Sequence, residues 1–189
     1  MSNGDLSHGV RTMRSPRSPE QTAPIRWLMA GDPAIRWQTM RGLLGAPGDQ
    51  WQVERNRVES EGWGAALLSL QDDDGQWARG SFLPEGFAWE QMRSEGQPWI
   101  ATCWVLTDLC QLGLEPESPS ACRTVQLVGD NSRWDHDGQP YWEGEVEECI
   151  NGRTVAQGAY FGVDVAATVE RLITQQMEDG SSTLSVVWR

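Results

Sequence analysis

The sequence predicts an all-α fold in which helices pair as hairpins. Successive segments carry apolar residues at the three- and four-residue spacing of a helix, as in Trp63, Leu67 and Leu70. Proline directly after a capping residue marks two helix starts, at Asp32 and at Ser118. No stretch before residue 183 shows the convincing pattern of a strand. These observations favour about eight helices and no sheet.

The first half of the chain is expected to form a tail followed by helices. Residues 1–23 are rich in Ser, Pro, Gly and Arg and carry almost nothing to bury, so we expect a disordered tail. Helical patterns follow, with Gly45 and Gly62 between them. The expected helices cover residues 24–30, 33–44, 49–60 and 63–70.

Two polar loops separate the later helices. Residues 71–96 form a long connection with four aromatic residues, which we expect to fold over the end of a helix pair or to line the mouth of a cavity. The second loop covers residues 133–147. The remaining helices are expected at residues 99–112, from residue 119 onward, at 148–161 and at 164–177.

Two of these helices have patterns that predict how they pack. Residues 99–112 are apolar nearly all round, which indicates that both faces of this helix are covered. Cys103 and Cys110 fall inside its pattern, where small buried thiols are usual. The last helix has one stripe that we expect to face inward, formed by Val165, Val169, Leu172 and Ile173.

The charged residues exclude several classes of function. The formal net charge of −12 argues against a nucleic-acid partner, because phosphate binding needs clustered Lys and Arg. All 15 basic residues are arginine, so a catalytic, Schiff-base or P-loop lysine is excluded. A histidine-dependent triad or metal site has one candidate, His136, because His8 lies in the expected tail.

The cysteines and the hydropathy pattern indicate a cytoplasmic protein. The four cysteines are too few and too widely spread for a secreted disulfide scaffold. No apolar run approaches the roughly 18 residues that cross a bilayer, and no signal-peptide core is apparent. We therefore expect a reducing compartment and no transmembrane segment.

An internal repeat relates two helix ends. Both copies read as the end of a helix, then Gln, three residues rich in Asp and Glu, and Gly. The first copy continues to Trp77, where the second has Ser182. The aligned positions are Gln71 and Gly75 in the first copy and Gln176 and Gly180 in the second.

Gln-x-x-x-Gly-x-Trp after an apolar helix resembles the QW repeat of the squalene cyclase and protein prenyltransferase β-subunit superfamily. Residues 31–38, 144–152 and 158–162 also resemble bacterial proteins described as squalene-cyclase-like or prenyltransferase-like. The resemblance covers roughly residues 24–180 and implies an α/α toroid, in which inner and outer helices alternate around a cavity. The Gln would bond to exposed backbone ends of helices, the Gly would permit the turn, and the Trp would pack over the adjoining repeat.

The chain departs from a closed toroid in two ways. A closed ring needs about six hairpins, and the sequence supplies only three to four, so we expect an incomplete ring, a partial version of a longer toroid. Residues 181–189 look unlike the repeats and are expected to form an atypical tail. One repeat domain over residues 24–180 would then have an uncovered apolar edge, which predicts self-association.

Neither an Asp-rich acid motif nor a full zinc site is apparent. Residues 72–74 are three aspartates, but they belong to the repeat turn, so the acid that protonates an alkene in squalene cyclases has no counterpart here. Prenyltransferases hold zinc through an Asp-x-Cys pair at a helix start and a later His, and the resemblance places Glu147 and Cys149 at that pair. A helix start lowers the pKa of a thiol. Zinc needs at least three protein ligands, which would require His136 as the third, so no cofactor is expected.

The resemblance also implies a pocket for an isoprenoid, because aromatic faces stabilise developing cations. Its candidate residues are Trp99, Trp104, Tyr160, Phe161 and Cys149. Packing in a core explains the same aromatic residues without a ligand.

Two functions stay open. The first is a terpenoid cyclase/prenyltransferase-like protein that binds an isoprenoid or another apolar ligand, with catalysis left undecided. The alternative is a non-catalytic helical-repeat interaction module, because residues 32–36 form the kind of helix start that occurs in HEAT-like repeats.

Overall fold

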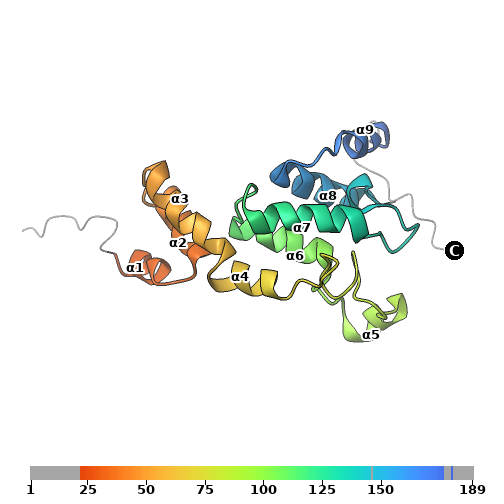
Figure 1. The fold of residues 1–189 in the computed structure, drawn as a ribbon, viewed down its shortest axis with the longest axis horizontal. Coiled ribbons are helices and arrows are strands. Elements are labelled where there is room, and N and C mark those ends of the chain that lie inside the picture. The colour runs from red at the N-terminus through yellow and green to blue at the C-terminus, as the bar shows by residue number, and fades with distance from the viewer. Residues whose placement is uncertain (1–21, 146, 177–179, 181–189) are drawn as a thin grey trace, which may run out of the picture.

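The computed structural model describes residues 22–145, 147–176 and 180, and over these ranges the protein is all-helical. In Figure 1, α1–α3 lie at one end of the molecule, α6, α7 and α8 pack together near its middle, and α5 and α9 lie toward the other end. The described ranges contain no β-strand, and isolated bridges pair Trp77 with Gly80 and Arg133 with Pro140. No helix in this part of the chain is long and apolar enough to cross a bilayer. The helices are α1 (Ala23–Met29), α2 (Pro33–Gly42), α3 (Gly48–Asn56), α4 (Gly62–Ser69), α5 (Met92–Glu95), α6 (Thr102–Leu112), α7 (Pro119–Asn131), α8 (Glu148–Phe161) and α9 (Ala166–Thr174).

The two helix starts predicted from capping residues, at Asp32 and Ser118, are confirmed. The Oδ1 atom of Asp32 accepts a hydrogen bond from the backbone N–H of Ala34 at 2.9 Å, and Pro33 is the first residue of α2. The Oγ atom of Ser118 accepts from the N–H of Ala121 at 3.3 Å and caps α7. Helix α8 covers the predicted range 148–161. Capping signals therefore located α2 and α7 correctly, while α8 begins without a side-chain cap.

Asp32 also has a second role that the sequence did not predict. Its Oδ2 atom accepts a hydrogen bond from the backbone N–H of Trp63 at 2.7 Å, in the first turn of α4. One carboxylate thus satisfies amides at the N-termini of two helices, where the helix dipoles favour negative charge. This contact joins the start of α2 to the start of α4.

The predicted start of α6 is wrong. The helix begins at Thr102, and Trp99 and Ile100 precede it with 60% and 57% of their surface exposed. In a helix from Trp99, the amides of Thr102 and Cys103 would bond to the preceding turn. They instead donate to the carbonyls of Gly80 and Ser81, at 3.0 and 2.9 Å. The long loop therefore takes the place of the first turn.

Helix α6 contacts α4 on one side and α8 on the other. Its buried residues are Thr102, Cys103, Val105, Leu106 and Leu109. They belong to a core that includes the stacked rings of Trp134 and Tyr141, 4.6 Å apart, and Val128 of α7. The prediction that both faces of α6 are covered is wrong, because Asp108 and Gln111 are exposed.

The predicted inward stripe of α9 is also partly wrong. Ile173 is 66% exposed, and Thr168 is the buried residue of this helix. The Oγ1 of Thr168 donates to the carbonyl of Trp142 at 3.4 Å, and Nη2 of Arg171 donates to the carbonyl of Glu145 at 2.7 Å. These polar contacts with the second loop select the face of α9 that packs, and they turn Ile173 outward.

The two Gln–Gly turns of the internal repeat have the same local geometry. Nε2 of Gln71 donates to the carbonyl of Gly75 at 2.9 Å, and Nε2 of Gln176 donates to the carbonyl of Gly180 at 2.9 Å. Both glycines have positive φ, +91° and +84°. The amide of Gln71 also bonds to Oγ1 of Thr124 in α7, at 3.0 Å.

Trp77 completes the first turn. Its ring is buried, and its Nε1 donates to the carbonyl of Leu67 in α4 at 2.7 Å. Its backbone N–H donates to Oγ1 of Thr102 at 3.2 Å, so the side chain and backbone join α4 to the start of α6. Ser182, at the corresponding position of the second turn, lies outside the described residues.

The aspartates of the first turn bond within the turn. Oδ2 of Asp72 accepts from the backbone N–H of Arg79 at 3.1 Å. The two carboxylate oxygens of Asp74 accept from the backbone and side-chain amides of Gln76, both at 2.9 Å. These contacts support a structural role for Asp72 and Asp74.

Candidate functional site

Two adjoining grooves lie on the exposed side of α6. The groove between α4 and α6 has a volume of about 360 Å³, and the groove between α6 and α8 has a volume of about 410 Å³. Gln111 lines both, so they meet along α6. Each volume is within the range of small-molecule sites.

The groove between α4 and α6 is mainly apolar. Its α4 wall is the stripe of Trp63, Leu67 and Leu70 together with Ala66. Trp63 and Leu70 are 55% and 68% exposed, so the stripe that predicted helix packing is open to solvent. The α6 wall consists of Asp108, Gln111 and Leu112.

The groove between α6 and α8 has a polar floor. Buried Gln157 donates through Nε2 to the carbonyl of Cys103 at 2.7 Å and to Oγ1 of Thr107 at 2.8 Å. Its Oε1 accepts from the hydroxyl of Tyr141 at 2.7 Å. Because both ends of this amide are bonded, Gln157 holds α8 in a defined position on α6. The groove is lined by Thr107, Cys110, Gln111, Cys149, Arg153, Ala156, Gln157 and Tyr160.

Arg153 lies between this groove and the ring of Trp104. Its guanidinium lies 4.5 Å from the ring centroid of Trp104, a cation–π distance. Its Nη1 donates to Oγ1 of Thr107 at 3.1 Å. Nε1 of Trp104 donates to the carbonyl of Phe82 at 3.0 Å, so the long loop 71–96 fixes the ring on which Arg153 stacks.

The structure separates the five candidate pocket residues into groups. Tyr160 and Cys149 line the groove between α6 and α8, and Trp104 lies beside it under Arg153. Trp99 is exposed and meets Trp104 edge-on at 4.4 Å. Phe161 is buried in the core, where it packs edge-on against Tyr160 at 5.0 Å.

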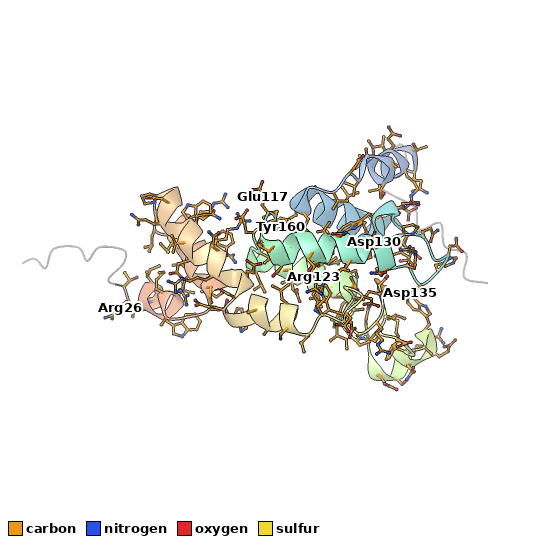
Figure 2. All side chains as sticks on the ribbon, in the orientation of Figure 1. Arg26, Glu117, Arg123, Asp130, Asp135 and Tyr160 are labelled. Atoms are coloured by element: carbon orange, nitrogen blue, oxygen red, sulfur yellow. The ribbon has the colours of Figure 1, made fainter. Side chains whose placement is uncertain are left out.

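Tyr160 lines this groove near the C-terminal end of α8 (Figure 2). Its hydroxyl donates to the carbonyl of Leu114 at 2.8 Å and accepts from Nη2 of Arg55 at 3.0 Å. Burial raises the pKa of Tyr160, while Arg55 opposes that rise. The phenol is therefore neutral and serves as a structural bridge.

The zinc site that the resemblance suggested is not assembled. No group of three or more His, Cys, Asp or Glu residues gathers within the described ranges in a way that could hold a metal ion. His136 is half exposed on the second loop, with its Nδ1 3.1 Å from Oδ1 of Asp137. Cys149 and Glu147 contact each other, with the thiol sulfur 3.7 Å from a carboxylate oxygen.

The expected lowering of the Cys149 pKa is wrong in direction. Partial burial raises the pKa of this thiol, and the negative charge of Glu147, which also accepts its proton, raises it further. These effects outweigh the start of α8, whose backbone amides favour the thiolate. Burial likewise raises the pKa of Cys110 to about 12. Both thiols of the groove are therefore protonated at neutral pH and are weak nucleophiles.

Glu147→Gln is expected to accelerate the alkylation of Cys149 by iodoacetamide about two- to fivefold at neutral pH, because removal of the carboxylate lowers the thiol pKa. Peptide mass spectrometry at timed intervals measures the rate. Exposed Cys122 in the same molecule is the internal control and should not change. An unchanged or lower rate at Cys149 would contradict the assigned role of Glu147.

The sequence interpretation missed several residues of the two grooves. Helix α8 carries one face with Cys149, Arg153, Ala156 and Tyr160, whose spacing of four, three and four residues is the spacing of a single helix face. That spacing was a usable signal. The exposure of the α4 stripe had no local signal, because it depends on how far α4 and α6 lie apart.

Comparison of the chain with known protein families, with curated proteins and with solved structures finds no match. The resemblance to the squalene cyclase and prenyltransferase superfamily, and the toroid that it implies, therefore stay predictions.

Proposed function

We propose that this protein is a terpenoid cyclase/prenyltransferase-like helical-repeat protein that binds an apolar small molecule, such as an isoprenoid, without transforming it. The observation that carries the proposal is the pair of adjoining grooves on one side of α6, one apolar and one with a polar floor. Ligand sites generally combine an apolar wall with a few placed polar groups. The ligand would lie across Gln111, with its apolar chain against the α4 stripe.

Binding without catalysis is supported by the raised pKa values of the thiols and of the carboxyl group that line the grooves. The thiols of Cys110 and Cys149 have raised pKa values, which leaves little thiolate at neutral pH. Burial also raises the pKa of Asp108, the carboxyl group that lines the apolar groove. None of these side chains hydrogen-bonds to a histidine in the described ranges, so none has the paired base that activates a nucleophile.

Leu70→Asp is expected to weaken the binding of farnesol at least about tenfold, because the substitution places a charge on the apolar wall of the groove. Native mass spectrometry follows the titration and gives the stoichiometry. Leu70 is 68% exposed, so the variant should keep the thermal stability of the wild type.

Leu43→Asp is the matched control. Leu43 is 60% exposed, follows α2 and lines neither groove. This variant should bind farnesol as the wild type does. If the wild-type chain does not bind farnesol, or if both variants lose binding equally, the proposal is wrong.

A protein-interaction module is the second candidate. It is favoured by apolar side chains that are exposed away from the grooves, namely Trp27 of α1 at 76%, Val53 of α3 at 55% and Ile173 of α9 at 66%. Such residues at both ends of a helical array fit an uncovered edge that self-associates. Sedimentation velocity over a range of concentrations tests this, since a single monomeric species at all concentrations would contradict self-association.

A further inference from the structure

Arg153 has hydrogen-bonding capacity that the described residues do not use. Only its Nη1 is bonded, to Oγ1 of Thr107. Nε and Nη2 have no hydrogen-bond or ion-pair partner within the described ranges, and no acid lies within 4.0 Å of the guanidinium. Stacking on Trp104 fixes the plane of the group. The result is a pre-oriented, unpaired cation at the edge of a groove.

The charge of the two grooves limits the ligand that this cation suits. Among the described residues that line either groove, Arg153 is the only basic one and Asp108 is the only acidic one. A diphosphate carries several charges and is normally held by several cations or by a metal ion. One guanidinium matches one carboxylate, which it binds through two parallel N–H···O bonds.

Asp108 does not neutralise Arg153. The two side chains come from α6 and α8, and they interact only through a longer-range attraction that opposes the effect of burial on the pKa of Asp108. The charge of Arg153 therefore remains available to a ligand. A side chain that needed Arg153 as a structural ion pair would lie within bonding distance of it.

We propose that the ligand is a long-chain carboxylate, whose carboxylate group binds Arg153 and whose chain crosses Gln111 into the apolar groove between α4 and α6. This inference rests on the proposed function and names its ligand class. The apolar residues Leu67, Leu70 and Leu112 take the chain, and the stacked guanidinium takes the charge. An isoprenoid diphosphate is a poorer match, because the described residues that line the grooves offer a single cation.

Dodecanoate and dodecan-1-ol provide the test, because they share a chain and differ in charge. Isothermal titration of the full chain should show dodecanoate binding at least about tenfold more tightly than the alcohol. Arg153→Gln should remove this preference and leave the affinity for the alcohol unchanged. Arg153→Lys keeps the charge but loses the planar fork, so it should retain part of the preference.

Arg123→Gln is the matched control. Arg123 lies on α7, is exposed, and lines neither groove (Figure 2). The variant loses the same charge from the chain and should keep the full preference for dodecanoate. Thermal unfolding of each variant identifies any loss of folding, in which case Arg153→Lys alone decides the outcome.

The outcomes separate this inference from the proposed function. Equal affinity of the wild type for acid and alcohol, or tighter binding of farnesyl diphosphate than of dodecanoate, overturns the carboxylate ligand and leaves the groove function standing. An equal loss of both ligands in Arg153→Gln shows that Arg153 supports the fold only, and also overturns it. Failure of the wild type to bind any of the three ligands overturns both proposals.

Discussion

Gly75→Ala is expected to lower the free energy of unfolding by about 3 kcal/mol or more. Gly75 has a φ of +91°, a region that costs an alanine roughly 1–2 kcal/mol. An added Cβ would also overlap the Cβ of Leu127 and come within 3.2 Å of the backbone nitrogen of Val128. Helix α7 is a rigid neighbour at this point, so the overlap adds roughly 1–3 kcal/mol. Urea denaturation followed by circular dichroism measures the change.

Gly86→Ala separates the two contributions. Gly86 has a similar backbone conformation, with φ of +75°, but nothing lies within 4 Å of the position of its added Cβ. This variant should lose only the roughly 1–2 kcal/mol of backbone strain. If the two variants are destabilised equally, the close packing of the Gln71–Gly75 turn against α7 contributes nothing to stability, and our account of Gly75 is wrong.

Arg55→Met is expected to lower the free energy of unfolding by about 2–4 kcal/mol. Arg55 of α3 donates through Nε to the carbonyl of Gly113 at 3.0 Å and through Nη2 to the hydroxyl of Tyr160 at 3.0 Å. Its Nη1 lies 2.9 Å from a carboxylate oxygen of Glu115. The side chain is largely buried, so the partners it leaves behind are not fully rehydrated. Methionine has an apolar side chain without the guanidinium, whose carbon lies 5.8 Å from the ring centroid of Trp37, so the variant also loses this cation–π contact.

Arg57→Met provides the comparison. Arg57 is about half exposed, and its ion pairs with Glu54 and Glu61 are long, at 3.7 and 3.6 Å. Exposed pairs of this kind contribute roughly 0–1 kcal/mol, so the loss should stay below about 1 kcal/mol. The same denaturation experiment measures both variants. Equal effects would show that Arg55 does not bridge α3 to the ends of α6 and α8.

Gly75 and Arg55 matter to the two grooves as well as to the stability of the fold. Gly75 allows the first turn to pack on α7, and Gln71 and Trp77 of that turn bond to α7 and α4. Arg55 bonds to Tyr160, which lines the groove between α6 and α8. The separation of α4, α6 and α8, and with it the shape of both grooves, therefore depends on contacts outside the grooves.

Local patterns in the sequence were enough to predict the all-helical class, the starts of α2 and α7, the bounds of α8 and the recurrence of the Gln–Gly turn. Each of these depends on residues within a few positions of one another: a capping carboxylate and the amide two residues later, or Gln71 and the carbonyl of Gly75. Such interactions form between neighbours in the chain, so their pattern is present in the sequence.

Contacts between distant parts of the chain set the start of α6, the buried face of α9 and the two grooves, and burial contributes most to the direction of the Cys149 pKa shift. The carbonyls of Gly80 and Ser81 replace the first turn of α6, and the carbonyl of Glu145 orients α9 through Arg171. These partners lie more than 20 residues apart in the chain. Burial is set by such distant contacts, and helical periodicity does not distinguish a stripe that packs from a stripe that lines an open groove.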